Sequence, residues 1–429
     1  MAFDLDASQQ SAWEGFLAGK NVGLFGREGC GKSAVLTRAI AHARRVHGVD
    51  RVGVMAWTTA AAKMIDGQPL HKFLQVGIAE LPKERVLEKV KANLFVRAKV
   101  TKTTVILIDE LPLIAARWFS VLEYVVRQLA PAGRHGRPWS GCQVVVGGDP
   151  LQLGPVHTRT TRHDAPVFMC RICRDSFLSC YGMLALLMGS HRQSSDSWFV
   201  ASLDRVRKGE VTDVDLMVLN ATSDGVTADE WDRRTQLRAL NVHVNAFNKD
   251  KLSRLAGAEY VFKCRDEIAP GLTHPARRAY AQRCMQQVAP PSVALKPGAV
   301  VLTTREVDGV PTATQGEVKE CRGLSVVCEF SGRLVKVAVA AFDVIDNCGT
   351  RLATRHAMPL ILAWAMTIHR AQGATLNTLA IDFGQLNWRL EGLVYSGLFR
   401  CRTLEGLFVR VLRGEHIVVD RHATAFYDR

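Results

Sequence analysis

Short apolar runs separated by longer amphipathic or polar stretches dominate the first 170 residues. These runs lie at 22–25, 52–57, 105–108, 144–146 and 167–169. Apolar runs that alternate with helical segments are typical of parallel strands, which are covered on both faces by the connecting helices. The pattern therefore predicts an α/β fold with a parallel sheet, in which ligands bind at the carboxyl ends of the strands.

The second half of the chain repeats this alternation with one interruption. We expect a helix over 196–207, and further apolar segments lie at 235–242, 299–303, 360–365, 378–382 and 407–411. Residues 311–357 carry several short β-like runs with turn residues between them, which predicts a small β-barrel insert. The stretch 268–298 holds five prolines and is expected to be an extended connector.

Composition narrows the class of protein. A chain of 429 residues with 48% hydrophobic content is long enough for two or three domains with sizeable cores. A formal charge of +14 favours a polyanionic partner such as nucleic acid. The first ten residues are acidic without an apolar run, and the apolar stretch near 358–368 is too short to span a bilayer. We therefore expect a soluble, intracellular protein without a membrane partner.

The eleven cysteines are scattered and odd in number, which indicates reduced thiols rather than a disulfide framework. One cluster is a candidate zinc site: Cys170, Cys173 and Cys180, with His157, His163 and His191 nearby. The second pair of cysteines lacks the spacing of zinc ligands, so we expect ordinary half-buried thiols there.

A phosphate-binding motif follows the first predicted strand. Residues 26–33 read GREGCGKS and match G-x-x-x-x-G-K-[ST] between the strand at 22–25 and a predicted helix over 32–46. Glycines allow the loop to close its backbone N–H groups around phosphates at the positive end of the helix. The nucleotide-binding residues expected here are Gly26, Arg27, Glu28, Gly29, Cys30, Gly31, Lys32 and Ser33. Lys32 would neutralise the β- and γ-phosphates, and the Ser33 hydroxyl would bind Mg²⁺.

Two carboxylates follow the apolar strand at 105–108. We expect Asp109 to hold Mg²⁺ opposite Ser33, and Glu110 to orient and deprotonate the attacking water. Gln152 follows Gly148-Asp149 and is placed to contact the γ-phosphate, with a simple polar turn as the alternative. The sequence thus predicts hydrolysis of a nucleoside triphosphate, with ATP and Mg²⁺ as cofactors.

Further motifs make the chain resemble the superfamily-one DNA helicases of the Pif type over nearly its whole length. The most specific segment is 359–376, which reads PLILAWAMTIHRAQGATL. The other segments that carry the resemblance are 5–9, 56–62, 67–73, 148–156, 191–193, 198–199, 207–209, 395–407 and 425–427.

The resemblance implies two tandem RecA-like P-loop domains. The first would span 1–185, with a short wedge-type insert at about 64–100. The second would comprise 186–310 and 358–429, and the insert at 311–357 would be SH3-like. The implied activity is ATP-dependent translocation on single-stranded DNA in the 5′-to-3′ direction, with unwinding of duplex DNA. Replication or repair proteins are expected partners, the free protein is expected to be a monomer, and the expected location is the nucleus or another DNA-containing compartment.

The resemblance also assigns residues. Gln9 looks like an adenine-reading glutamine, with Gln10 as a possible register alternative. Arg192 and Arg400 are candidate arginine fingers that report closure of the two domains, although each alone could be a surface arginine. The motif at 359–376 adds Gln372 and Gly373 to the nucleotide site. The candidate DNA contacts are Thr58, His71, Phe73, His369 and Arg370; Phe73 and His369 could instead be core residues.

The chain departs from the family pattern at Phe399, Gly397, Arg370-Ala371 and Thr59. These departures spare the nucleotide-contacting residues and put the details of DNA grip in question. Two alternatives stay open: a DNA-binding ATPase that acts only as a switch subunit, and a superfamily-one relative directed to RNA. A hydrolytic base such as Glu110 argues against a pure switch.

Overall fold

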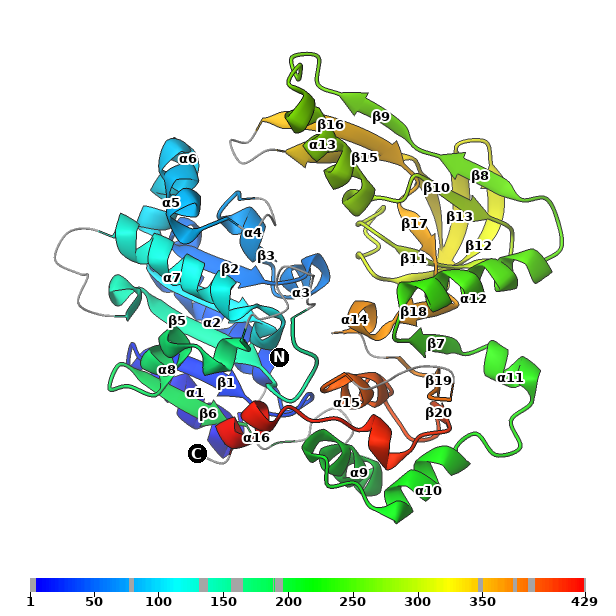
Figure 1. Ribbon diagram of the computed structural model, residues 1–429, viewed down its shortest axis with the longest axis horizontal. Helices are drawn as coiled ribbons and strands as arrows, with labels where there is room; N and C mark the ends of the chain where they lie inside the picture. Colours follow the sequence, from blue (N-terminus) through cyan, green and yellow to red (C-terminus); the bar gives the residue numbers. More distant parts are fainter. Residues whose placement is uncertain are drawn as a thin grey trace. The chain divides into compact units, whose positions relative to one another are not determined.

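The computed structural model describes residues 5–76, 81–130, 138–155, 165–187, 189, 196–345, 350–372, 376–384 and 390–427. The chain divides into two compact units (Figure 1). The first unit comprises Met1–Asp224 and Gln372–Arg429, and the second comprises Gly225–Ala371.

A six-stranded parallel sheet lies at the centre of the first unit (Figure 1). Its order is β3-β2-β4-β5-β1-β6, and each neighbouring pair is parallel. The strands are β1 (Asn21–Phe25), β2 (Val52–Ala56), β3 (Gln68–Pro69), β4 (Val105–Asp109), β5 (Gln143–Gly148) and β6 (Gly182–Leu186). The parallel sheet predicted from the apolar runs is confirmed.

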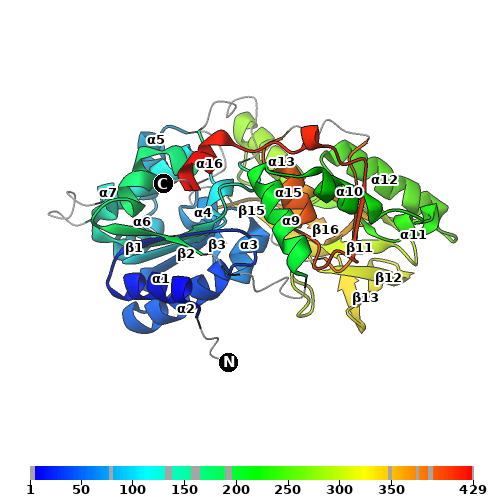
Figure 2. The same ribbon diagram turned by 90° about the horizontal axis from the view of Figure 1, so that it is seen from below.

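Helices cover both faces of this sheet (Figure 2). Because successive side chains of a strand point to opposite faces, Val105 and Leu107 of β4 join the core under α1 and α2, whereas Ile106 and Ile108 join the core under α5 and α7. The helices of this layer are α1 (Ala7–Leu17), α2 (Lys32–His47), α3 (Thr59–Met64), α4 (Leu70–Phe73), α5 (Lys83–Ala92), α6 (Leu94–Lys102), α7 (Ala116–Leu129) and α8 (Arg171–Phe177).

The remaining elements of the first unit come from distant parts of the chain. They are α9 (Ser197–Lys208), α10 (Asp213–Ala221), the parallel pair β19 (Leu379–Asp382) and β20 (Leu407–Arg410), α15 (Leu393–Leu398) and α16 (Arg421–Tyr427). Helix α16 packs on the first sheet: the Phe426 ring lies 5.0 Å from that of Phe25 and 5.7 Å from that of Phe168. Helix α16 is therefore fixed beside the strand that leads into the phosphate loop.

The second unit contains antiparallel sheets and one parallel pair. Strands β14-β13-β12-β11-β17 form one antiparallel sheet, β15-β16-β9 a second, and β10-β8 a third, while β7 and β18 are parallel. The strands are β7 (Thr235–Arg238), β8 (Tyr260–Lys263), β9 (Arg265–Ile268), β10 (Ser292–Leu295), β11 (Val300–Thr303), β12 (Gln315–Arg322), β13 (Ser325–Phe330), β14 (Arg333–Ala338), β15 (Ala340–Ile345), β16 (Arg351–Ala357), β17 (Leu360–Leu362) and β18 (Ala365–Thr367). The helices are α11 (Ala228–Asp232), α12 (Asn241–Arg254), α13 (Pro275–Val288) and α14 (Ile368–Ala371).

Two expectations from the sequence are wrong in detail. Val167–Met169 is a 3-10 turn rather than a strand, and the last strand of the first sheet is β6 instead. The region expected as an extended connector contains α13, which begins at Pro275; proline is well tolerated in the first helical turn because the N–H it lacks has no partner there. Within 311–357, β12 pairs with β11 and β16 pairs with β9, both outside that segment; the small β-barrel insert expected there stays a prediction.

Candidate active site

The phosphate loop links β1 to α2 in the conformation that its glycines permit. Gly29 and Gly31 have φ values of 76° and 85°, which favour glycine. A Cβ atom on Gly26 would lie 2.4 Å from the carbonyl oxygen of Leu187, so a side chain does not fit there. Helix α2 starts at Lys32 without a side-chain cap, which leaves its first N–H groups available to an anion.

Lys32 lies over its own loop. Its Nζ donates to the carbonyl oxygens of Gly26 at 2.9 Å and Arg27 at 2.8 Å. These contacts hold the ammonium group above the loop, where a phosphate would replace the carbonyl acceptors. Ser33 follows in the first turn of α2 and is exposed, as a metal-binding hydroxyl must be.

The two carboxylates stand at the carboxyl end of β4. Burial raises the pKa of Asp109, and the nearby charge of Lys32 and the hydrogen bond from the Glu110 N–H oppose that shift. Glu110 has a φ of 54°, a left-handed conformation that is uncommon outside glycine and asparagine and is often found at functional sites. A hydroxyl and a carboxylate are hard oxygen donors, so Ser33 and Asp109 fit Mg²⁺.

Arg400 reaches the phosphate loop from the far end of the sequence. Its guanidinium forms an ion pair with Glu28, and its Nε donates to the Ser396 carbonyl at 3.0 Å. The side chain is 0% exposed, and burial lowers the pKa of Arg400 to about 9. Gln152 donates to the same Glu28 carboxylate at 3.4 Å. Three of the predicted site residues therefore meet at Glu28, inside the loop.

A buried cluster around Asp149 was not predicted from the sequence. Both oxygens of Asp149 accept hydrogen bonds from Arg207 at 2.9 Å, and the hydroxyls of Tyr395 and Tyr427 donate to it at 3.1 and 2.9 Å. Burial raises the pKa of Asp149, but the charge and hydrogen bonds of Arg207 outweigh it, so the net shift is downward. Tyr395 also lies 3.4 Å from the Glu28 N–H. The cluster thus joins the segment that carries Gln152 to the segment that carries Arg400.

Only the segments of this cluster could be found in the sequence. Residues 148–156, 207–209, 395–407 and 425–427 each carry part of the family resemblance. Their pairing gives no local signal, because Arg207 and Tyr427 lie 58 and 278 residues from Asp149.

Gln9 occupies a structural position beside the loop. It is 3% exposed, its Nε2 donates to the Cys30 carbonyl at 3.1 Å, and its Oε1 accepts from the Asp6 N–H at 3.1 Å as part of the capping box of α1. Gln10, the register alternative, is exposed and donates to Glu14. Adenine recognition by Gln9 stays a prediction, since both ends of its amide are engaged within the protein.

The candidate DNA contacts of the first unit have different surroundings. The Thr58 hydroxyl accepts from the Ala61 N–H at 3.1 Å at the start of α3. Burial lowers the pKa of His71 to about 4, and its ring lies edge-on to Trp57. Phe73 is 2% exposed and belongs to the core, so it does not present a face on which a base could stack. The core alternative for Phe73 is the one that the structure supports.

The second unit holds the other two candidates at its end. His369 is half-buried, and burial lowers its pKa. Arg370 is exposed, and its backbone N–H donates to the Thr367 hydroxyl. Their role in binding DNA stays a prediction.

Three residues of the predicted nucleotide site lie in or next to segments that the structure does not describe. Arg192 and Gly373 lie outside the described residues. Both polar atoms of the Gln372 side chain are buried and have no hydrogen-bond partner within the described ranges. Such an amide lacks the partners that a bound group could supply.

Among the described residues, no group of three His, Cys, Asp or Glu side chains is arranged to hold an ion; His157, His163 and His191 of the candidate cluster lie outside them. The Cys170 sulfur instead accepts from the Cys173 N–H and caps α8. Among the described helices, none is long and apolar enough to span a bilayer.

Comparisons with known proteins show what the whole chain is similar to. Residues 5–215 match the family model described as PIF1-like helicase. The chain is 29% identical over 432 residues to the ATP-dependent DNA helicase Pif1 of Bdellovibrio bacteriovorus, covering 99% of this chain and 92% of the relative. It is 28% identical to ATP-dependent DNA helicase PIF1 of Danio rerio and spans 64% of that longer protein. The crystal structure of Pif1 helicase from Candida albicans superposes with a TM-score of 0.87 at 26% identity, covering 100% of this chain and 99% of that one.

Proposed function

We propose that this chain, which belongs to the PIF1-like helicase family, is an ATP-hydrolysing DNA helicase that translocates along single-stranded DNA and separates duplex DNA. The observation that carries this proposal is the meeting of Arg400 and Gln152 with Glu28 inside the phosphate loop. A loop that only binds nucleotide does not require a buried arginine from a segment more than 370 residues away in the sequence. Such an arginine is required if the rate of hydrolysis depends on the position of that distant segment.

In the proposed reaction, the glycines of the loop and Lys32 bind the triphosphate. When phosphate arrives, the Lys32 ammonium exchanges the carbonyls of Gly26 and Arg27 for phosphate oxygens. Ser33 and Asp109 would hold Mg²⁺, which supplies positive charge to the phosphate oxygens. Glu110 orients the attacking water and accepts its proton.

Arg400 has to leave Glu28 before its charge can stabilise the phosphoryl group in transfer. Because this guanidinium is buried, its interaction with an anion is stronger than it would be in water. Gln152 shares the Glu28 carboxylate and is released by the same movement. We assign Arg192 the role of a second finger, and Gln372 and Gly373 the completion of the nucleotide site.

The arrangement of domains and the direction of movement are part of the proposal. Two RecA-like domains, at 1–185 and at 186–310 with 358–429, would close on ATP and reopen after hydrolysis. Alternating grips through Thr58, His71, His369 and Arg370 would move the protein 5′-to-3′ along the strand. Replication and repair proteins are the partners that we propose, in a DNA-containing compartment.

The test is unwinding of duplexes that carry either a 5′ or a 3′ single-stranded tail, with ATP in the presence and absence of Mg²⁺. The proposal expects Mg²⁺-dependent unwinding from the 5′ tail. Unwinding from the 3′ tail alone would overturn the polarity, and hydrolysis without unwinding of either substrate would favour the switch subunit. Unwinding of RNA duplexes in preference to DNA would favour the RNA-directed alternative.

A further inference from the structure

Helix α16 contacts the turn that carries Gln152. The Tyr427 hydroxyl of this helix donates to Oδ1 of Asp149 at 2.9 Å. The same Oδ1 accepts from the Leu151 N–H at 3.2 Å, and the carbonyl oxygen of Asp149 accepts from the Gln152 N–H at 3.0 Å. These bonds close a tight turn over residues 149–152, so the orientation of the Asp149 carboxylate helps to fix the position of the Gln152 backbone.

Helix α16 is a rigid support for this contact. Its Phe426 ring packs edge-on against Phe25 at the end of β1, with the ring centroids 5.0 Å apart. The Arg207 guanidinium lies 4.5 Å from the centroid of the Tyr427 ring, a cation–π contact that restrains the ring and the direction of its hydroxyl. Tyr427 therefore reaches Asp149 from an element that is packed on the strand leading into the phosphate loop.

The Tyr427 hydroxyl is a hydrogen-bond donor in this contact. Burial raises the pKa of Tyr427 well above its usual value, and the charge of Asp149 adds to that shift. A hydroxyl that keeps its proton donates to the carboxylate throughout the neutral pH range. The other donors to this carboxylate within the described residues are Arg207, Tyr395 and Leu151, which belong to α9, α15 and the turn itself. The Tyr427 hydroxyl thus connects the turn to α16.

The turn is packed closely against α15. A Cβ atom on Gly392, at the N-terminus of α15, would lie 2.6 Å from the carbonyl carbon of Gln152 and 2.7 Å from the carbonyl oxygen of Leu151. The Leu153 N–H also donates to the Ser396 hydroxyl of this helix at 3.0 Å. Because protein interiors are close-packed, a movement at the start of the turn is transmitted to Gln152 rather than absorbed.

The Gln152 side chain lies at the phosphate loop. It is 6% exposed, and its Nε2 donates to the Glu28 carboxylate at 3.4 Å. We propose that Tyr427 is a positioning residue for ATP hydrolysis, which acts through Asp149 to hold the Gln152 amide at the γ-phosphate. The inference rests on the proposed function, because it assigns Tyr427 to the hydrolysis reaction. A tyrosine that only stabilised the fold would affect stability and leave the chemical step unchanged.

Tyr427→Phe removes the hydroxyl and keeps the ring that packs against Arg207. A small displacement of Gln152 weakens a contact made in the transition state more than the binding of ATP in the ground state. A misplacement of about 1 Å can cost roughly 10²-fold in rate, and a single lost hydrogen bond should cause a smaller one. We therefore expect kcat to fall ~5-fold while KM for ATP changes less than ~2-fold.

The experiment is a double-mutant cycle in steady-state ATP hydrolysis by the full chain, with Mg²⁺ and saturating oligo(dT). The four proteins are the native chain, Tyr427→Phe, Gln152→Ala and the double variant. Gln152→Ala removes the amide, so the Tyr427 hydroxyl then has nothing left to position. We expect Tyr427→Phe to lower kcat ~5-fold in the native chain and less than ~2-fold in the Gln152→Ala background.

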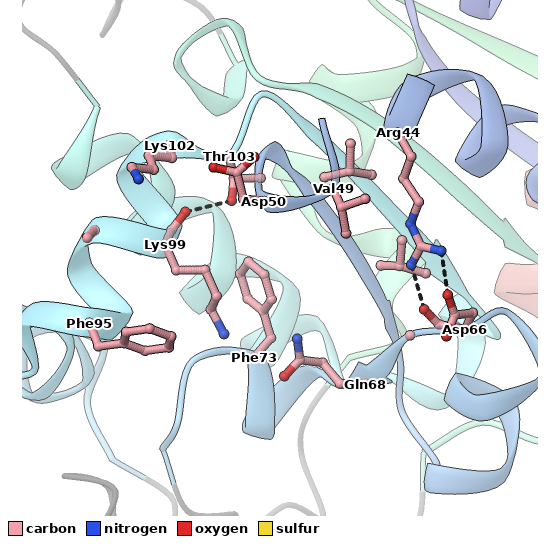
Figure 3. A pocket seen from close by; sticks show the side chains of 14 residues that line it. Arg44, Val49, Asp50, Asp66, Gln68, Phe73, Phe95, Lys99, Lys102 and Thr103 are labelled. Carbon is pink, nitrogen blue, oxygen red and sulfur yellow. Dashed lines mark hydrogen bonds and ion pairs between the residues drawn. The ribbon is translucent and has the colours of Figure 1, made fainter. Parts of the chain in front are cut away.

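Thr103→Val is the matched control for the loss of a buried hydroxyl. Thr103 is 8% exposed, and its hydroxyl donates to the Lys99 carbonyl oxygen at 2.9 Å at the end of α6, the same length as the Tyr427 contact. It lines a cavity whose lining includes no residue of the phosphate loop or of the cluster around Asp149 (Figure 3). Calorimetry should therefore show a similar loss of stability in both single variants, whereas Thr103→Val should change kcat less than ~2-fold.

The inference is overturned if Tyr427→Phe lowers kcat by the same factor with and without the Gln152 amide, because a purely structural effect does not depend on that amide. It is also overturned if kcat is unchanged in Tyr427→Phe, or if Gln152→Ala retains the native kcat. Any of these outcomes in a chain that hydrolyses ATP leaves the proposed function intact. A native chain that does not hydrolyse ATP would contradict the proposed function as well.

Discussion

Replacement of Arg207 by methionine tests the buried cluster around Asp149. In the native protein Asp149 is 1% exposed and accepts two hydrogen bonds from Arg207, one from each of two tyrosines and one from the Leu151 N–H. Arg207→Met leaves the carboxylate buried without its counter-charge. Breaking a buried pair in this way costs about 3–5 kcal/mol. Because the other three hydrogen-bond donors to Asp149 remain, we expect a destabilisation at the lower end of this range, about 3 kcal/mol.

Differential scanning calorimetry measures this effect. At about 2–4 °C per kcal/mol for a unit of this size, the transition of the first unit should fall by roughly 6–12 °C. The matched control is Arg171→Met on α8, whose ion pair with Asp175 is exposed at the surface. That variant should lose less than about 1 kcal/mol. Adding Asp149→Asn to Arg207→Met removes the unpaired charge and should recover part of the loss.

The pH dependence of the difference gives a second readout. In the native protein the pKa of Asp149 is lowered on balance, so its contribution is present above the unfolded value of about 3.9 and is lost as the pH falls through the folded value. Without Arg207, burial is opposed only by the charge of Lys32 and the remaining hydrogen bonds, so we expect the pKa of Asp149 to rise. The variant then loses stability as the pH rises above about 4. The gap between variant and native protein should be smaller at pH 5 than at pH 8, and an equal gap or a loss below about 1 kcal/mol would refute the reasoning.

Three further predictions concern the nucleotide site. Lys32→Ala should abolish ATP hydrolysis and weaken nucleotide binding. Arg400→Ala should abolish DNA-stimulated hydrolysis with less effect on nucleotide binding, which titration with a fluorescent ATP analogue measures. Normal turnover in Arg400→Ala would contradict the assignment of Arg400 as an arginine finger. Glu110→Gln should lower kcat by roughly 10²–10⁴-fold and retain ATP binding, because it removes the proton acceptor and little else; an unchanged kcat in steady-state hydrolysis would exclude it as the base. Gly31→Ala introduces a Cβ at a φ of 85° and should cost about 1–2 kcal/mol of stability together with nucleotide affinity; a variant as stable as the native protein by calorimetry would show that the strain argument is wrong.

The sheet of the first unit could be predicted because its strands appear in the sequence as apolar runs at regular intervals, separated by helical segments. Strands such as β4 are apolar on both faces, which is visible in a run of four residues. The pattern predicts a strand at Val167–Met169 rather than at β6, since a short apolar run does not distinguish a strand from a buried turn. Pro275, one of five prolines that favour extended chain in this stretch, lies in the first turn of α13.

The candidate site divides in the same way. The phosphate loop and the carboxylates are contiguous motifs, so their chemistry is readable from the sequence. The contact between Arg400 and Glu28 and the convergence on Asp149 join residues hundreds of positions apart. Only packing brings them together. The motif around Phe73 allows either a DNA contact or a core position, and only the packing shows that the ring belongs to the core.

The central claim is that ATP hydrolysis here is coupled to DNA. The most direct measurement is the steady-state rate of ATP hydrolysis by the full chain, with Mg²⁺, in the absence and the presence of single-stranded DNA. The account predicts a rate that rises on addition of DNA in the native protein and does not rise in Arg400→Ala. A native rate that is the same with and without DNA would contradict it.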